Sequence, residues 1–474
     1  MTREILMSLA AILATSFVAL LWKRKNANKY AVPPRITFQG KVLNIILYPF
    51  ARYPGLFNLA SNLGKKKDSA PKPNIFLPLD LDELKSQAIQ SCGGIKDFGD
   101  GWHEPAFRLA IGRVNAATYS PLGKIGVHNF LLRRLTARLR FIEEIKMDAN
   151  KGWNEKPVRK PLFLMGLPRT GTTYLHRLLS LDPASRSPLA WELYDPCPRI
   201  RSGENFVEKD ERMRVKYMDR AIQELLKIIP HLSDCHEVGS TLPEECLVAL
   251  AMDIPFLFST FHLLIASPYD HFDWDASVPY TNYYKVLQLM QFQAEKNNVL
   301  AKANKRWVLK CPIHLGFLKY LYKGFPDANV VWTHRDPCEA MSSLASLLRT
   351  SQDFHEGSGL IHLDKLGKDV THYAKFMLQR ADEFHSDPKN KSCSHSDIQY
   401  KELIADPIGT VRELYSKFGY EFTAEYECIL NKYIQEQKEK REGSGHCHKY
   451  VSDDYGLNKE TILKDLKWYT DKYL

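Results

Sequence analysis

The chain has 474 residues, 44% of them hydrophobic, and its 65 Lys and Arg outnumber its 55 Asp and Glu. This length and composition indicate a folded protein with a large core, either one α/β domain with extra helices or two domains. The excess of ten positive charges suits an anionic ligand or a membrane surface, and the basic residues lack the interleaved aromatics of a nucleic-acid-binding arm. The nine cysteines form no CxxC pair, so neither a disulfide framework nor a zinc site is predicted.

An uninterrupted run of 18 uncharged, largely apolar residues stands near the start of the chain, at 5–22. Such a run is at the lower limit for a helix that crosses a bilayer, and the basic cluster at 23–25 does not fit a cleaved signal peptide. We therefore predict a single-pass anchor over residues 1–25, with a buried soluble helix as the alternative. The flanking charges predict a main domain on the cytosolic side of the endoplasmic reticulum or Golgi membrane. A sequon at Asn390 is compatible with the opposite orientation.

Residues 26–78 are predicted to be a juxtamembrane linker. Within it, residues 42–63 are rich in Leu, Ile, Phe and Tyr and carry few charges. This composition fits a segment on the membrane interface and equally a helix packed on the main domain. Residues 79–155 follow with a helical pattern, clearest at 130–139, where arginines alternate with apolar residues at helical spacing. We interpret them as a helical cap.

Residues 156–474 have the pattern of an α/β domain. Short apolar runs bounded by Gly, Pro or polar residues predict strands, and helical stretches separate them. The candidate strands are residues 162–165, 306–310, 329–334 and 397–400. Strands alternating with helices predict a central parallel sheet with crossover helices.

The stretch FLMGLPRTGTTY, residues 163–174, is typical of a strand, a tight phosphate-binding loop and a helix. Gly166 and Gly171 let the backbone turn so that successive N–H groups converge on an anion at the positive end of the helix. A nucleotide triphosphatase has lysine where this chain has Thr172. The cation of the loop is instead Arg169, whose planar guanidinium binds phosphate or sulfate through two hydrogen bonds. The pattern therefore disfavours ATP hydrolysis.

This loop, followed by Leu181-Asp182-Pro183, resembles the one that holds the 5′-phosphosulfate of 3′-phosphoadenosine 5′-phosphosulfate (PAPS) in sulfotransferases, in their tyrosylprotein and bacterial-type branches. A second motif, residues 329–337 with Ser343 eight positions after Arg335, resembles the family's 3′-phosphate site. The resemblance extends over about residues 81–474. It implies that the following residues bind PAPS: Arg169, Thr170, Gly171, Thr172, Thr173, Arg335 and Ser343.

Three further residues receive roles from the same resemblance. Lys310 lies in the segment WVLKCPIHL, residues 307–315, which is similar to the strand end whose lysine reaches the sulfate and the bridging oxygen. Tyr400 occupies a segment similar to the one beside the adenine, although packing in the core explains a tyrosine there equally well. Glu192, next to the apolar Trp191, stands where relatives carry a glutamate that acts as general base. Other candidates for the base are His236, Glu245 and His314.

The sequence thus predicts a membrane-anchored sulfotransferase that moves a sulfuryl group from PAPS to an acceptor hydroxyl without a metal. The acceptor is a lipid-like alcohol, a carbohydrate or a protein tyrosine, and the sequence leaves these three open. Two alternatives remain: a P-loop kinase or nucleotidase, and a non-catalytic scaffold that kept a nucleotide-binding fold.

Overall fold

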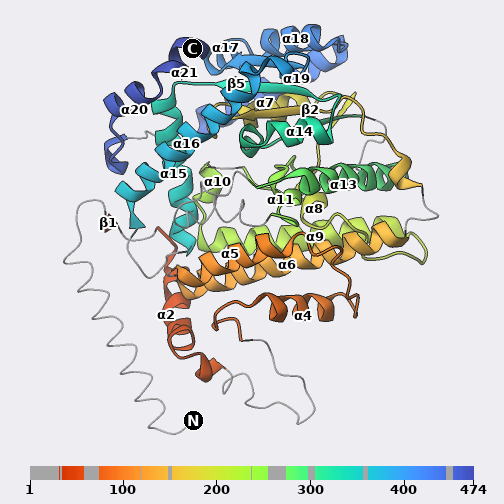
Figure 1. Ribbon diagram of the computed structural model, residues 1–474, viewed down its shortest axis with the longest axis vertical. Helices are drawn as coiled ribbons and strands as arrows, with labels where there is room; N and C mark the ends of the chain where they lie inside the picture. Colours follow the sequence, from red (N-terminus) through yellow and green to blue (C-terminus); the bar gives the residue numbers. More distant parts are fainter. Residues whose placement is uncertain are drawn as a thin grey trace.

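The computed structural model of the chain describes most of the residues after position 30. Figure 1 shows a sheet surrounded by helices, with the helices nearest the N-terminus and those nearest the C-terminus at opposite ends of the molecule. The predicted anchor at 5–22 and the segment His446-Cys447-His448 lie outside the described residues. The described ranges are 31–32, 35–57, 74–117, 119–147, 152–235, 237–254, 274–296, 305–355, 361–444 and 452–474.

A five-stranded parallel sheet forms the centre of the molecule, with strand order β3-β4-β2-β5-β7. Leu162 at the start of β2 pairs with Val308 on one side and with Asn329 on the other, so β2 is the middle strand. All four predicted strands exist, although the one predicted at 397–400 runs from 395 to 399 and Tyr400 begins a helix. The two-residue edge strand β3 is too short to leave a pattern in the sequence. The bounds are β2 (Leu162–Gly166), β3 (Ser185–Arg186), β4 (Arg306–Lys310), β5 (Asn329–His334) and β7 (His395–Gln399).

Side chains of β2 alternate between two hydrophobic cores, one on each face of the sheet. Leu162 and Leu164 face the smaller core, and Phe163 and Met165 face the larger one. The smaller core is closed by α7 (Thr172–Ser180), α17 (Tyr400–Ala405), α18 (Pro407–Phe418) and α19 (Ala424–Ser444). Among the helices on the larger core are α13 (Ser277–Lys296), α14 (Leu318–Gly324), α15 (Pro337–His355), α16 (Leu363–Ser386), α20 (Lys459–Asp465) and α21 (Lys467–Tyr473).

The segment predicted as a helical cap is helical, and it packs into the same core as the sheet. Buried side chains of α4 (Leu81–Ser91), α5 (Glu104–Ala116) and α6 (Pro121–Met147) belong to the larger hydrophobic cluster. The domain boundary at residue 155 therefore stays a prediction. The remaining elements are β1 (Ala31–Val32), α2 (Phe38–Arg52), α8 (Ala190–Tyr194), α9 (Phe206–Ile228), α10 (Leu232–Cys235), α11 (Leu247–Leu250), β6 (Ile361–His362) and four 3₁₀ turns (Trp153–Glu155, Pro312–Gly316, Pro388–Asn390 and Ser452–Tyr455).

The membrane prediction concerns residues that the structure does not describe. Within the described ranges, every helix falls short of the length and apolar character needed to cross a bilayer. The anchor at 5–22 thus remains a prediction. Part of the ambiguous apolar segment at 42–63 is described: it belongs to α2, which packs beside α6 and α9.

Candidate active site

The loop between β2 and α7 has the geometry of an anion-binding turn. Gly171 has φ of 90°, in the left-handed region, and a Cβ placed on it would lie 3.0 Å from Cδ2 of Tyr400. A Cβ on Gly166 would lie 2.3 Å from the hydroxyl oxygen of Thr333 on β5. Helix α7 starts at Thr172 and has no side-chain cap at its N-terminus. Its first backbone N–H groups and its positive dipole end therefore face the loop.

The residues predicted separately for the two ends of PAPS are in direct contact. Nε of Arg169 donates a hydrogen bond to Oγ of Ser343 at 2.9 Å, and the carbonyl of Arg169 accepts one from Arg335 at 2.8 Å. The guanidinium of Arg335 lies 4.2 Å from the ring centroid of Tyr400. Arg169 has φ of 74°, a strained value for a non-glycine residue that costs on the order of 1–3 kcal/mol and is found mostly at functional sites. Four predicted ligand residues thus meet at the carboxyl ends of β2, β5 and β7.

Arg335 also forms the surface ion pair that a lone arginine would be expected to form. Its Nε and one terminal nitrogen contact a carboxylate oxygen of Glu339 at 3.1 and 3.0 Å. The side chain of Glu339 is 60% exposed, whereas that of Arg335 is 21% exposed. An exposed ion pair of this kind is weak, so a dianionic ligand competes with Glu339 at low cost.

Lys310 lies at the carboxyl end of β4 and connects the loop helix to a carboxylate. Its Nζ donates to Oγ1 of Thr173 at 3.3 Å and forms an ion pair with Oε1 of Glu245. The backbone N–H of Cys246 donates to the carbonyl of Lys310 at 3.0 Å, which fixes the Glu245 segment against β4. The side chain of Glu245 keeps 21% of its surface exposed. Glu245 is therefore an accessible carboxylate beside the predicted phosphosulfate site.

Comparison with known proteins identifies the family of this arrangement. The model of the Sulfotransferase family matches residues 161–424, more than half of the chain. The chain belongs to this family.

Similar proteins agree with that assignment. The omega-hydroxy-beta-dihydromenaquinone-9 sulfotransferases Stf3 of Mycobacterium bovis and Mycobacterium tuberculosis are 26% identical to this chain over 272 residues, which cover 57% of it. The match spans 64% of the length of these curated relatives. The fold is that of sulfotransferase STF9 from Mycobacterium avium, with a TM-score of 0.69, 24% identity and coverage of 83% of this chain and 96% of that one. Sulfotransferase STF1 from Mycobacterium tuberculosis H37Rv matches with a TM-score of 0.65 and 27% identity. This match covers 82% of this chain and 98% of that one.

Within this sulfotransferase fold, Glu192 is not the free carboxylate that its position beside Trp191 led us to expect. Its Oε1 accepts a hydrogen bond from Arg186 at 2.5 Å, and its Oε2 accepts one from the backbone of Leu189 at 2.9 Å. Both partners of the ion pair are buried, and the Arg186 guanidinium also lies 4.4 Å from the ring centroid of Trp307. Glu192 therefore caps α8 and neutralises a buried arginine.

Replacing Glu192 with Gln is expected to lower the free energy of unfolding by about 3–5 kcal/mol, because it leaves the Arg186 charge buried without a counter-charge. Urea denaturation of the two proteins measures this difference. The double variant Arg186→Met/Glu192→Leu removes both charges and should recover most of the stability. A single variant as stable as the parent would contradict the buried-pair interpretation.

Of the two histidine candidates for the base, His314 is the one that the structure describes. His314 is completely buried, its Nδ1 pairs with the Tyr280 hydroxyl at 2.6 Å, and burial lowers its pKa to about 3. His176, on the loop helix, is also buried, and burial holds its pKa well below the usual value. His236 lies outside the described residues. Of the described candidates, Glu245 is the one placed next to Lys310 and Thr173.

The depressed pKa of His314 predicts a loss of stability in acid. Above pH 6.5 the ring is neutral in both the folded and the unfolded chain, so pH has no effect through this group. As the pH falls from 6.5 towards 3, His314 becomes protonated in the unfolded chain but stays neutral in the folded chain. The free energy of unfolding therefore falls by about 1.4 kcal/mol per pH unit. Between pH 6.5 and 4.5, His314→Gln should therefore lose stability less steeply than the parent in urea titrations. Exposed His362→Gln is the control, and equal slopes for His314→Gln and the parent would contradict the assignment.

Two loop threonines differ in what they offer a ligand. The Thr170 side chain is buried, donates to the carbonyl of Leu167 at 2.6 Å and contacts the hydroxyl of Thr333 at 2.6 Å. The Thr170 hydroxyl thus joins the loop to β5, and the role of Thr170 in binding PAPS stays a prediction. Thr173 is half-buried and meets Lys310. Thr333 lies within the motif at 329–337 but received no role from it, and no motif contains Arg186.

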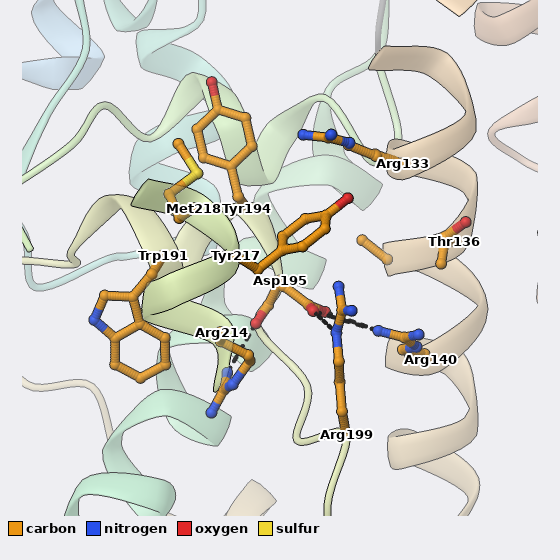
Figure 2. Close-up of a pocket in the computed structure, with 11 residues that line it drawn as sticks. Arg133, Thr136, Arg140, Trp191, Tyr194, Asp195, Arg199, Arg214, Tyr217 and Met218 are labelled. Carbon is orange, nitrogen blue, oxygen red and sulfur yellow. Dashed lines mark hydrogen bonds and ion pairs between the residues drawn. The ribbon is translucent and has the colours of Figure 1, made fainter. Parts of the chain in front are cut away.

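A concavity beside α8 gathers several cations around one carboxylate (Figure 2). Asp195 forms ion pairs with Arg140, at 3.3 Å, and with Arg199, and its carbonyl accepts a hydrogen bond from Arg214 at 2.8 Å. The junction thus joins α6, α8 and α9 and fixes the segment that carries Glu192. Its lining residues are Arg133, Thr136, Ala137, Arg140, Trp191, Tyr194, Asp195, Arg199, Arg214, Tyr217 and Met218.

In the part of the chain that the structure describes, no three or more His, Cys, Asp or Glu side chains gather in a group able to hold a metal ion.

Proposed function

We propose that this member of the sulfotransferase family transfers a sulfuryl group from PAPS to the hydroxyl of an acceptor. The observation that carries the proposal is the contact of Arg169 with both Ser343 and Arg335, at 2.9 and 2.8 Å. The family resemblance assigns Arg169 to the 5′-phosphosulfate and the other two residues to the 3′-phosphate. A kinase or nucleotidase that binds ordinary adenine nucleotides has no use for a second anion site built against the first.

The residues around the loop fit a nucleotide with two anionic ends. The amides of Gly171 to Thr173, with Arg169, are placed for the 5′-phosphosulfate, since the loop turns tightly at a glycine and no side chain caps α7. Arg335 and Ser343 are placed for the 3′-phosphate. Tyr400 lies against both Gly171 and Arg335, which suits a ring that packs beside the adenosine.

PAPS, when bound, supplies the sulfuryl group and leaves as adenosine 3′,5′-bisphosphate. Glu245 is the residue that we assign as general base: it removes the proton of the acceptor hydroxyl as the new oxygen–sulfur bond forms. Lys310 and Arg169 provide fixed positive charge where negative charge grows on the leaving phosphate. Because Lys310 contacts both Glu245 and Thr173, it holds the base close to the first turn of α7.

The acceptor that we propose is a lipid-like alcohol, reached by an enzyme held at a membrane through residues 5–22 with its main domain in the cytosol. Support comes from the apolar run and its basic flank, and from the named substrate of the curated relatives, an omega-hydroxylated dihydromenaquinone. Carbohydrate and tyrosine acceptors are the outcomes against which this choice is tested.

A transfer assay tests the reaction and the acceptor together. Full-length protein receives ³⁵S-labelled PAPS with a membrane lipid extract, an oligosaccharide mixture or a tyrosine peptide, and label is expected in the lipid fraction. Arg169→Ala should abolish it. Label in the sugar or peptide would overturn the choice of acceptor alone. Transfer from γ-labelled ATP instead would favour the kinase alternative, and no transfer despite tight binding of adenosine 3′,5′-bisphosphate would favour a scaffold.

Protease treatment of sealed microsomes tests the orientation. A cytosolic main domain is degraded from outside, whereas a lumenal one survives until detergent is added. Survival would overturn the cytosolic assignment.

A further inference from the structure

Helix α2 presents an apolar stripe to its surroundings and a polar side chain to the protein. The four residues Phe38, Val42, Ile45 and Ile46 follow the i, i+4, i+7, i+8 spacing that places side chains on one face of a helix. Phe38 is 82% exposed, Ile45 46% and Ile46 56%, and Val42 is half-buried, whereas Asn44 is buried. We call these four residues the outer stripe. It is the reverse of the arrangement expected for a helix on the surface of a soluble domain.

The inner face of α2 is fixed, so the helix cannot roll to bury the stripe. Oδ1 of Asn44 accepts a hydrogen bond from the backbone N–H of Leu122 in α6 at 3.0 Å. The backbone N–H of Thr37 donates to the carbonyl of Ile228 at the end of α9, also at 3.0 Å. A Cβ on Gly40 would lie 3.0 Å from Cγ2 of Ile228, so glycine lets the two helices approach closely. The exposure of the stripe is therefore built into the packing of α2.

The charges of α2 suit an anionic lipid surface. The helix contains Lys41 and Arg52 and no acidic residue. Tyr53, which follows it, is 48% exposed, and Arg52 lies 5.5 Å from the centroid of its ring. An apolar stripe with basic residues and interfacial aromatics is typical of a helix that lies in the plane of a membrane.

The length of chain before α2 also favours a lipid surface as the partner of the outer stripe. Eight residues, 23–30, separate Trp22, the end of the apolar run, from Ala31, which pairs with His362 of β6. The nine Cα–Cα steps from Trp22 to Ala31 span at most about 30 Å in an extended chain. The four basic residues between them, at 23, 24, 25 and 29, add to the attraction for anionic headgroups. If residues 5–22 span a bilayer, this short connection holds the described part of the chain close to its surface.

We propose that the outer stripe of α2 lies in the boundary between the headgroups and acyl chains of the bilayer, as a second membrane contact besides the anchor. The choice of a bilayer as the partner rests on the proposed anchor, whereas the exposure of the stripe is observed in the structure. A lipid-like acceptor would then reach an enzyme docked on the membrane in a fixed orientation.

Site-specific photo-crosslinking tests this contact. Full-length protein with p-benzoylphenylalanine in place of Ile46 is reconstituted into phosphatidylcholine and phosphatidylserine vesicles, irradiated and analysed by mass spectrometry. Lipid adducts are expected at position 46. The matched control is position 404, an isoleucine that is 43% exposed on α17, at the far end of the molecule from α2. No adducts are expected there.

Three results would overturn the inference: crosslinks from position 46 to residues 1–30 of the same chain, crosslinks to a second copy, or equal lipid labelling at 46 and 404. Extraction with alkaline carbonate is run in parallel to test the anchor. Protein that resists extraction but forms no lipid adduct at 46 refutes the α2 contact and leaves the anchor standing. Transfer of ³⁵S in detergent tests the proposed reaction independently of both.

Discussion

Replacing Glu245 with Gln is expected to lower kcat for sulfuryl transfer by about 10²–10⁴-fold, the usual contribution of a general base. The amide keeps the size of the side chain and an oxygen that can accept from Lys310, but it cannot take a proton at neutral pH. Single-turnover transfer from ³⁵S-labelled PAPS measures the chemical step. The affinity for adenosine 3′,5′-bisphosphate should stay within a few-fold of the parent, because Glu245 lies on the side of Lys310 and not among the contacts of Arg335.

Glu244→Gln is the matched control for this experiment. The Glu244 carboxylate accepts a hydrogen bond from the backbone N–H of Glu245 at 2.7 Å, so it lies next to the base. We expect a change of less than about tenfold for this variant. If Glu192→Gln, corrected for its fraction folded, loses more activity than Glu245→Gln, the assignment of the base to Glu245 is wrong.

Replacing Arg335 with Met is expected to weaken the binding of adenosine 3′,5′-bisphosphate by about 10–150-fold. This range corresponds to the 1.5–3 kcal/mol of a hydrogen bond to a charged group. Binding of adenosine 5′-phosphate, which has no 3′-phosphate, should change little. Isothermal titration calorimetry with both nucleotides gives the two ratios.

Glu339→Gln is a control for which the affinity for adenosine 3′,5′-bisphosphate is not expected to fall. It removes the carboxylate that holds Arg335 at 3.0 Å, so the affinity for the bisphosphate should stay equal or rise. An equal loss of affinity for both nucleotides in Arg335→Met would mean that this arginine supports the loop through the Arg169 carbonyl and does not recognise the 3′-phosphate.

The sheet and the loop were predictable because local sequence determines them. Of the four long strands, β2, β4 and β5 have apolar centres, and strands separated by helical stretches admit few topologies. The loop is defined by glycines whose positions tolerate no side chain, as the contacts of Gly166 with Thr333 demonstrate. Arg169 and Arg335 meet because the carboxyl ends of neighbouring parallel strands share one edge.

The partners of the carboxylates were not predictable in this way. Glu192 stands between Trp191 and Leu193, and Glu245 stands between Glu244 and Cys246. Neither context shows which distant residue pairs with the carboxylate. Arg186, on the short edge strand β3, forms an ion pair with Glu192. An isolated bridge between Leu189 and Pro243 brings the Glu245 segment alongside α8. Such choices depend on which distant segments pack together. The same limit applies to α2, since an apolar helix has the same composition whether its stripe points inward or outward.

In the proposed binding mode, the hydrogen bond from Arg335 to the carbonyl of Arg169 couples the two anion sites. Arg169 holds a left-handed backbone conformation that is costly for arginine, and the hydrogen bond from Arg335 supports that conformation. Whatever free energy a 3′-phosphate contributes to ordering Arg335 also favours the loop conformation at the sulfuryl end, and the reverse holds by linkage. A donor without the 3′-phosphate would then be at a double disadvantage, binding more weakly and leaving the loop less firmly set for the chemical step.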